Sequence, residues 1–500
     1  MNVALSPHEG LLFLDSLVAL FTQSIPCALF RALIRMAMGW SLAVLLVGGN
    51  VFAQQIAAPE TLRVNLGEAI LEAINRSPEI DIAASTADFA EARYRFARAN
   101  RFLTEFRATT AHAPAPGLKN PNDTPTDRLY LDPDVRNEWG ALRPFNQIEL
   151  EAVQPIYTWG ELGGSIKAAR YGVEVEEAAV RQKMLEVALR TGELYYGVLL
   201  ADALSRLTLQ AGQIVDQAKA EIRRLLDEGA PDVDDADEAQ LLITEQEYFR
   251  RVAEVTQRRL TAYAGLTRQL FLPQGTVAAP RADVLQPIEF TPDSLETYFE
   301  LALANRPELE QAAAGIQARD ALVRVARSDY YPKLFLAGSA RLAGTPGRYR
   351  QPNPYISDPL RGRGLQAGIG FRQNLNFVQT QARVEQAEAE LNQVRYQLDA
   401  AQQLILFEVE DAYRNMLIAR AALDAQNQAL QLSKEWLRVE TINFDLDLGD
   451  TENLVRAVQS NLELEINYLV AVRDYNVAVL RLLNATGTLV SRAESGTLVD

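Results

Sequence analysis

The chain has 500 residues, of which 48% are hydrophobic and 23% are charged, a balance typical of a folded protein rather than a disordered one. Its net charge is −16 and no basic patch stands out, which argues against nucleic acid as a partner. The single cysteine, Cys27, excludes disulfide frameworks and thiolate metal sites.

The N-terminal segment has the pattern of an export signal. Arg31 and Arg35 precede the apolar run Trp40–Val47, which is too short to form a stable membrane anchor. Val51-Phe-Ala53 then offers the small residues that a signal peptidase prefers. We therefore predict a signal peptide over residues 1–53, with cleavage after Ala53.

Two features of the same segment leave alternatives open. A second apolar run lies upstream of Met36 and Met38, so the start of translation could be mis-assigned and residues 1–35 could lie outside the protein. Cys27 follows Ser-Ile-Pro, which is a poor lipidation motif, so lipidation is not favoured.

One helix opening occurs twice along the chain. NRSPEIDIAA stands at Asn75–Ala84, and ANRPELEQAA stands at Ala304–Ala313. Further matches follow in the same order, such as Tyr195 with Tyr413. The sequence therefore predicts two copies of one unit, over residues 62–267 and 291–488, joined by a linker over 268–290 and followed by a tail over 489–500.

Each copy contains a long stretch without proline in which apolar residues recur at every seventh position. These residues are Val173, Val180, Val187, Leu194 and Ala201 in the first copy, and Val384, Leu391, Leu398, Ile405, Ala412 and Ala419 in the second. Such spacing is typical of a coiled-coil seam. We predict helices over about 159–226 and 378–446, each about 100 Å long at 1.5 Å per residue. A globular core needs no helix of that length.

Strand-like alternation occurs between the helices. Predicted strands cover about 103–113 and 145–157 in the first copy, and about 333–343 and 364–375 in the second, with exposed loops over about 114–144 and 344–362. The second strand of each pair alternates most clearly. Its polar positions are Gln147, Glu149 and Glu151 in the first copy, and Gln366 and Arg372 in the second. Strands of about ten residues can cross a bilayer when tilted.

A soluble half-buried sheet alternates in the same way and is commoner overall. The export signal and the long helices favour strands that cross a membrane. Because hydrocarbon tolerates no open sheet edge and four strands cannot close a barrel, the protein would then have to oligomerise. The five polar residues would line the lumen, where Glu149 and Glu151 would favour cations or simply wet the pore wall.

The ordered set of segments resembles the TolC-type outer membrane efflux proteins over about residues 60–490. The segments that carry the resemblance are the repeated opening, QPIYTWGELGGSIKAA at Gln154–Ala169 and GDTENLVRAVQSNLE at Gly449–Glu463. The resemblance implies a mainly α-helical homotrimer with a small membrane β part. Each protomer would contribute four strands to one 12-stranded β-barrel in outer membrane lipid, and long helices would form a periplasmic tunnel.

The resemblance also implies a function and partners. Family members are passive exit ducts of tripartite efflux or type I secretion systems, docked to a periplasmic adaptor protein and an inner membrane pump, and located in the bacterial outer membrane. The pump selects the cargo, which can be a drug, a metal ion or a protein. The long helices would suit an elongated periplasmic tether or scaffold without a pore equally well, but paired membrane-length strands favour the duct.

In this family the helix turns farthest from the barrel form the gated tip and contact the adaptor. The matching residues here are Gly229, Ala230, Asp232, Asp234 and Asp235 in the first turn, and Gly449, Asp450, Asn453 and Arg456 in the second. Asn453 and Arg456 stand where relatives carry an acidic pair that narrows the aperture. The acids of the first turn are either a solvated helix start or, near a symmetry axis, a repelling cluster that favours an open tip.

Catalytic chemistry has little material in this sequence. His8 and His112 are the only histidines, and no glycine-rich phosphate loop, serine nucleophile elbow or zinc-ligand spacing is present. We therefore expect no enzymatic activity, no catalytic residues, no metal site and no cofactor.

Overall fold

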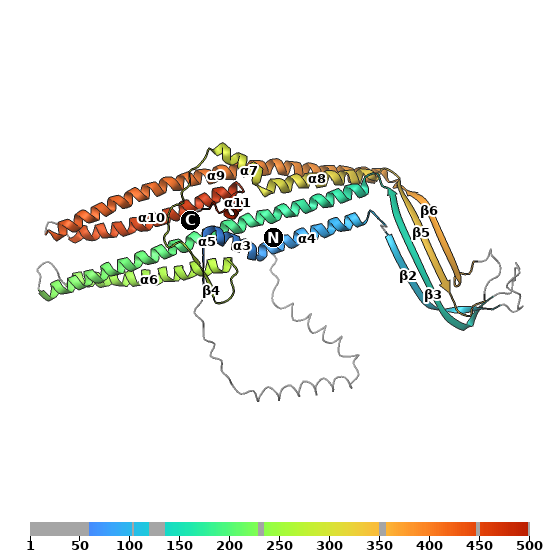
Figure 1. Ribbon diagram of the computed structural model, residues 1–500, viewed down its shortest axis with the longest axis horizontal. Coiled ribbons are helices and arrows are strands. Elements are labelled where there is room, and N and C mark those ends of the chain that lie inside the picture. The colour runs from blue at the N-terminus through green and yellow to red at the C-terminus, as the bar shows by residue number, and fades with distance from the viewer. Residues whose placement is uncertain are drawn as a thin grey trace, which may run out of the picture. The chain divides into compact units, whose positions relative to one another are not determined.

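The computed structural model describes residues 60–102, 105–119, 136–228, 235–349, 357–446 and 451–498. The predicted signal peptide lies outside these residues. Two very long helices, four helices that flank them and a four-stranded sheet make up most of the described chain (Figure 1). None of the described helices combines the length and the hydropathy that a membrane-spanning helix requires.

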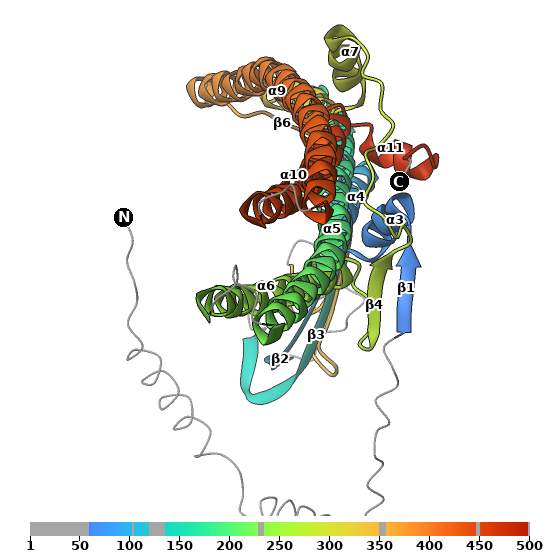
Figure 2. The ribbon, with the colours of Figure 1, turned by 90° about the vertical axis from the view of Figure 1, so that its left-hand side faces the viewer.

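The long helices are α5, Glu161–Glu228, and α9, Phe377–Asp445, with 68 and 69 residues. Four shorter helices pack beside them, namely α4, Pro78–Ala99, α6, Asp235–Gln269, α8, Pro307–Ser328, and α10, Thr451–Ala485. α4 and α6 lie along opposite halves of α5, while α8 and α10 lie between α5 and α9 (Figure 1). The helices therefore form one layer, which is curved when it is viewed along its length (Figure 2).

Interhelical ion pairs fix the openings of α4 and α8, both of which begin with proline, a residue suited to the first helical turn. The Arg190 guanidinium of α5 donates a hydrogen bond of 2.6 Å to Glu79 in the first turn of α4. This hydrogen bond lowers the pKa of Glu79 from its ordinary value. Arg306, just before α8, is buried and bonds to Glu408 of α9 at 2.6 Å. Each opening is thereby held against a long helix.

The sheet is antiparallel throughout and has the strand order β2-β3-β5-β6. Its strands are β2, Glu105–Lys119, β3, Arg136–Tyr157, β5, Lys333–Gly344, and β6, Gly362–Arg372. β6 ends at Arg372, before the predicted boundary at 375, because its partner β5 begins at Lys333, which lies opposite Arg372.

The predicted loop over 114–144 is wrong at both ends, because β2 continues to Lys119 and β3 begins at Arg136. Pro114 lies opposite Pro144, so two residues without an N–H face each other at one position of the ladder. The register then shifts between Pro116 and Gly117. Proline and glycine signalled a loop in the sequence, whereas here they mark an irregularity within a longer strand pair.

A compact region lies on the convex side of the helix layer, near its middle (Figure 2). It contains α3, Leu66–Arg76, α7, Leu295–Asn305, α11, Leu489–Glu494, and a parallel pair of strands, β1, Glu60–Val64, and β4, Thr276–Pro280. The largest fully buried aliphatic side chains of this core include those of Leu66, Ile70, Leu266, Leu480, Leu483 and Leu489.

This region corrects two sequence predictions. The segment 268–290 is more than a linker, because it contains β4, whose partner β1 lies at the start of the described chain. The segment 489–500 is more than a tail, because it contains α11, in which Leu489 and Ala493 are buried. Elements of five or six residues are too short to show a period in the sequence.

One buried amide joins the segment after β4 to α10. The fully buried Asn476 side chain donates a hydrogen bond of 2.8 Å to the Gln286 carbonyl and accepts one of 2.9 Å from the Ile288 N–H. A single side chain thus satisfies two backbone groups of a segment that has no regular structure.

Candidate functional site

The four-stranded sheet has one strongly apolar face. Side chains directly opposite each other on neighbouring strands share a face. One row across the sheet consists of Ala108, Leu150, Ala340 and Leu365. On β6 the large side chains of this face are uncovered, since Leu365 is 84% exposed, Ile369 71% and Phe371 75%. An uncovered apolar surface of this width marks an interaction with lipid or another protein.

The opposite face is polar and charged. Its central row consists of Arg107, Glu151, Ser339 and Gln366. Strand alternation places all five predicted lumen residues, Gln147, Glu149, Glu151, Gln366 and Arg372, on this face. Arg107 and Arg341 also lie on this face but were not predicted from the sequence, because apolar residues such as Phe335 share the face and obscure the alternation of their strands.

Side chains on the charged face contact one another along and across the strands. Gln147 donates a hydrogen bond of 3.1 Å to the Glu149 carboxylate, and Arg341 donates one of 2.9 Å to the side-chain oxygen Oε1 of Gln147. Near the helices, the Arg372 guanidinium lies 5.5 Å from the centre of the Phe335 ring. That ring covers Gly370, where an added Cβ would stand 2.8 Å from Phe335 Cζ.

Residues 357–361, which precede β6, fold over the far end of the charged face. Leu360 packs there against a small buried cluster formed by Ala115, Phe145 and Ala343. Ala343 lies opposite Gln147, and Phe145 stands two positions before Gln147 on β3, so the cluster lies on the charged side of the sheet. The second hairpin therefore covers part of the face that carries the predicted lumen residues.

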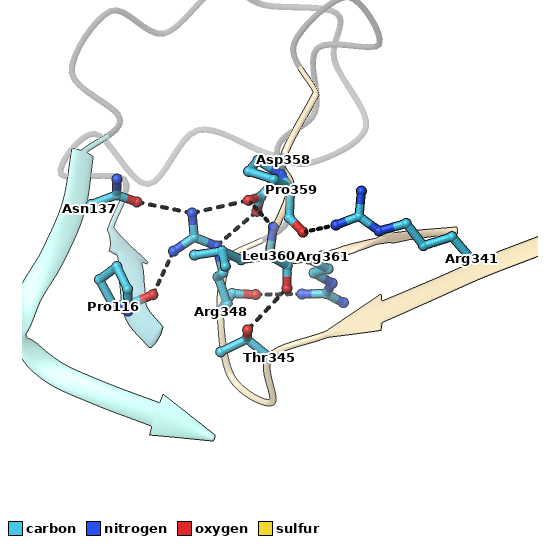
Figure 3. A network of polar contacts seen from close by, with 9 residues as sticks. All are labelled: Pro116, Asn137, Arg341, Thr345, Arg348, Asp358, Pro359, Leu360 and Arg361. Carbon is cyan, nitrogen blue, oxygen red and sulfur yellow. Dashed lines mark hydrogen bonds and ion pairs between the residues drawn. The ribbon is translucent and has the colours of Figure 1, made fainter. Parts of the chain in front are cut away.

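A buried arginine fastens this segment to the first hairpin (Figure 3). The side chain of Arg348 is only 4% exposed and forms a two-pronged ion pair with Asp358, with hydrogen bonds of 2.8 and 3.1 Å. The same guanidinium donates to the Pro116 carbonyl at 2.5 Å and to Asn137 Oδ1 at 3.0 Å. An isolated arginine in a predicted loop offered no signal of this role.

Further hydrogen bonds close the segment around Arg348 (Figure 3). Thr345 Oγ1 donates to the Leu360 carbonyl at 3.0 Å, and Arg361 donates to the Arg348 carbonyl. Arg341 also donates to the Pro359 carbonyl at 3.2 Å, which links the segment to the charged face of β5. We call residues 345–349 and 357–361 the hairpin clasp.

Several contacts hold the junction between sheet and helices together. The chain leaves β3 through two residues with left-handed backbone, Trp159 with φ of 51° and Gly160 with φ of 95°. Trp159 Nε1 donates a hydrogen bond of 2.9 Å to the Pro332 carbonyl, just before β5. Lys333 forms ion pairs with Glu161 at 2.9 Å and Asp329 at 2.7 Å. The exit of β3 and the entry of β5 are thereby tied together.

At the other ends of the helices, the structure covers only part of the predicted tip. Gly229, Ala230, Asp232, Asp234, Gly449 and Asp450 lie outside the described residues. Asp235 begins α6, while Asn453 is half-buried and Arg456 is exposed in the first turns of α10. The structure therefore brings no acidic cluster together here among the residues that it describes.

The two helix pairs are held differently near these ends. Lys219 of α5 forms an ion pair of 2.5 Å with Glu245 of α6. In the other pair, also near these ends, Asn461 of α10 donates a hydrogen bond of 3.0 Å to Ser433 of α9, and both side chains are buried. A charged contact in one pair thus corresponds to a neutral contact in the other.

Within the described ranges, no three histidine, cysteine, aspartate or glutamate side chains lie close enough together to hold a metal ion. The candidate site is instead a sheet with two chemically distinct faces, set at the end of long helices.

Known proteins share this arrangement. Residues 299–488 match the profile of a family described as outer membrane efflux protein. The chain is 23% identical over 258 residues to outer membrane efflux protein BepC of Brucella suis. This match covers 48% of this chain and 53% of BepC. It is also 23% identical over 349 residues to protein CyaE of Bordetella pertussis, and this second match covers 67% of this chain and 69% of CyaE. The chain therefore spans about half the length of BepC.

A solved structure extends the likeness to most of the chain. The CmeC outer membrane channel of Campylobacter jejuni matches with a TM-score of 0.66 and 15% sequence identity, covering 85% of this chain and 86% of CmeC. At that identity the likeness concerns the fold. This chain therefore shares with CmeC a mainly helical fold that carries a small sheet.

Proposed function

We propose that this chain, a member of the TolC-type outer membrane efflux protein family, is the outer membrane channel-tunnel of a tripartite efflux or type I secretion system. It acts as a passive exit duct and has no catalytic activity. The observation that carries the proposal is the two-faced sheet set on helices of 68 and 69 residues. The apolar face suits lipid, the charged face suits a water-filled bore, and the helices, about 100 Å long, reach deep into the periplasm.

The open edges of the sheet support a homotrimer. In the described sheet, β2 and β6 are edge strands, and their outer backbone groups have no strand partner. Unpaired N–H and C=O groups are very costly in hydrocarbon, so the edges of one protomer must pair with those of others. Three copies of four strands give the 12-stranded barrel of the family, with Gln147, Glu149, Glu151, Gln366 and Arg372 lining its lumen.

The helix ends far from the sheet are the proposed contact with the adaptor protein, through which the duct reaches an inner membrane pump. The residues concerned are Gly229, Ala230, Asp232, Asp234, Asp235, Gly449, Asp450, Asn453 and Arg456. Support comes from chain topology, because α5 and α9 end, and α6 and α10 begin, at the end of the helix layer far from the sheet (Figure 1).

An elongated tether without a pore is the second candidate, and the long helices favour it as much as they favour a duct. A tether, however, has no use for a sheet face on which Leu365, Ile369 and Phe371 stand uncovered. The two functions differ in location, since a tether without a lipid-facing surface would wash off membranes with salt.

The test of the proposed function combines fractionation with electrophysiology. The mature protein is expected in the outer membrane fraction as a heat-sensitive trimer, and the purified trimer is expected to conduct ions in a planar lipid bilayer. A monomer that stays in solution without detergent would contradict the proposal, and so would a membrane-bound trimer that conducts no current.

The lumen assignment predicts the ion selectivity of the pore. Replacing Glu149 and Glu151 with glutamine should lower the permeability ratio of potassium to chloride by roughly twofold or more, because each protomer loses two carboxylates from the bore. Reversal potentials in a salt gradient measure this ratio. Glu296→Gln, in the first turn of α7 on the convex side, is the matched control and should leave the ratio unchanged. Equal ratios for all three proteins would contradict the lumen assignment.

The hairpin clasp predicts the conductance of the outer mouth. Arg348→Ala leaves the Asp358 carboxylate buried without its partner, a loss that typically costs about 3–5 kcal/mol. The clasp should then leave the charged face, and single-channel conductance should rise. Arg363→Ala removes the same charge from the exposed start of β6 and should conduct like the unmodified channel. Identical conductance in the two variants would show that the clasp does not narrow the bore.

The acidic first turn predicts an effect at the tip. Asp234→Asn combined with Asp235→Asn should change single-channel conductance or its dependence on calcium, because three copies of these acids near the symmetry axis repel one another. The measurement compares single-channel current traces of the double variant and the unmodified trimer, recorded with and without calcium. Unchanged traces would favour a solvated helix start.

A further inference from the structure

A groove of about 340 Å³ lies between α5 and α8, directly beneath the sheet. Trp159 and Tyr331 line its end nearest the sheet, and the side chains of Lys167, Arg324 and Arg327 line it farther down. At the bottom of the groove the two helices pack closely, because Gly164 has no side chain. An added Cβ at Gly164 would lie 2.7 Å from Val325 Cγ2 and 2.9 Å from the Ala321 carbonyl oxygen of α8. α5 and α8 have α4 and α9 on their outer sides, so the groove lies in the interior of the protomer's own helix layer.

The upper end of the groove continues the apolar face of the sheet. Tyr157 lies opposite Leu334, which lies opposite Phe371 on that face. The Trp159 ring meets Tyr157 edge-on, with centroids 5.0 Å apart, and stacks on Tyr331 at 4.8 Å. All three rings are about half exposed. Half-exposed tyrosine and tryptophan at the end of a lipid-facing surface are typical of the level where acyl chains meet headgroups.

The lower part of the groove is positively charged. Arg324 pairs with Asp320, and Arg327 pairs with Glu388 at 2.6 Å, so these two charges are compensated. Lys167 is exposed, and among the described residues no carboxylate lies within ion-pair distance of it. The groove therefore presents one uncompensated ammonium group and two guanidinium groups with spare N–H donors.

The depth of these cations matches a lipid headgroup. Lys167 follows the start of α5 at Glu161 by six residues, which is about 9 Å at 1.5 Å per residue. Its flexible side chain can extend back toward the sheet. The headgroup region of one leaflet is roughly 5–7 Å thick, so a phosphate beside the Trp159 and Tyr331 rings is within reach of Lys167.

We propose that this groove binds the phosphate headgroup of an anionic phospholipid from the periplasmic leaflet of the outer membrane. The phosphate contacts Lys167 and Arg324, the upper part of the lipid lies against Trp159 and Tyr331, and the acyl chains follow the apolar face of the sheet. The inference rests on the proposed function, because it requires that face to contact lipid. The bound lipid would fix the depth of the trimer in the membrane at each protomer.

Quenching of Trp159 by brominated lipid tests the proposal. The full mature trimer carries Trp139→Phe and Trp436→Phe, so that Trp159 is its reporting tryptophan, and is placed in bilayers that contain brominated phosphatidylglycerol or brominated phosphatidylcholine. Phosphatidylglycerol is expected to reach half-maximal quenching at a mole fraction about fivefold lower, the preference that one basic residue near a lipid surface typically supplies. Lys167→Gln with Arg324→Gln should abolish this preference.

The control variant is Arg170→Gln on the same helix, which is exposed, pairs with Glu174 at 3.6 Å and does not line the groove. It should keep the full preference for phosphatidylglycerol. Equal quenching by the two lipids would overturn the proposal, and so would a preference that survives in the Lys167 and Arg324 double variant. Displacement by glycerol 3-phosphate as efficient as that by phosphatidylglycerol would also overturn it, because the site would then bind free phosphate rather than lipid.

Conductance recorded from the same trimer separates this inference from the proposed function. A trimer that conducts ions but shows no lipid preference overturns the headgroup site alone. A trimer that inserts and conducts nothing overturns the duct itself.

Discussion

Replacing Leu365 with arginine is expected to remove the trimer from the outer membrane. Leu365 is 84% exposed on the apolar face, in the middle row of the sheet. An arginine on the lipid face of a transmembrane strand near the bilayer midplane costs about 2–4 kcal/mol, and the trimer carries the substitution three times. The heat-sensitive trimer band of the outer membrane fraction, run on a gel without boiling, measures the loss.

Gln366→Arg is the matched control, because it introduces the same side chain at the next residue of β6. Gln366 belongs to the charged row with Arg107, Glu151 and Ser339, where an arginine remains in water. This variant should assemble in normal amounts. If Leu365→Arg and Gln366→Arg gave equal trimer, the apolar face would not contact lipid, and both the duct and the headgroup site would lose their basis.

Replacing Asn476 with alanine is expected to lower the stability of the compact middle region by about 2–4 kcal/mol. The substitution removes the partners of the Gln286 carbonyl and the Ile288 N–H at once. Leaving a buried polar group without a hydrogen-bond partner costs about 1–3 kcal/mol, and two groups lose their partner here. The midpoint of thermal unfolding, followed by the helical circular dichroism signal of the detergent-solubilised trimer, should fall by several degrees.

Asn427→Ala is the control for this effect. Asn427 belongs to α9 and borders the hollow formed by the 287–291 segment, but its side chain is exposed. Removing an exposed amide usually changes stability by less than about 0.5 kcal/mol. Equal shifts in the two variants would show that the Asn476 hydrogen bonds do not hold the segment after β4.

The long helices and the strand β3 were predicted best from the sequence, because each has a long periodic signal. The seventh-position repeat from Val173 to Ala201 lies within α5, and the one from Val384 to Ala419 lies within α9. The alternation of Ile148 and Leu150 with Glu149 and Glu151 corresponds to the two faces of β3. Many residues contribute to each of these patterns, so a few exceptions do not hide the period.

Short elements and isolated contacts were missed for the opposite reason. β1, β4 and α11 have five or six residues each, and each is stabilised by partners far away in the sequence. The extension of β2 and β3 beyond Pro114 and Pro144 was obscured by residues that usually end strands. Arg348 gave no signal at all, because its meaning depends on Pro116, Asn137 and Asp358, which only the folded hairpins bring to it.

The amino-acid sequence by itself determined the long helices and the two-faced strands, because repeated spacing of apolar side chains is a local property that survives without knowledge of the fold. Only the tertiary structure decided which strand rows lie together, that the hairpin clasp covers the charged face, and that Lys167, Arg324 and Trp159 meet in one groove. Those features depend on register and helix packing, which bring together residues that the sequence holds far apart.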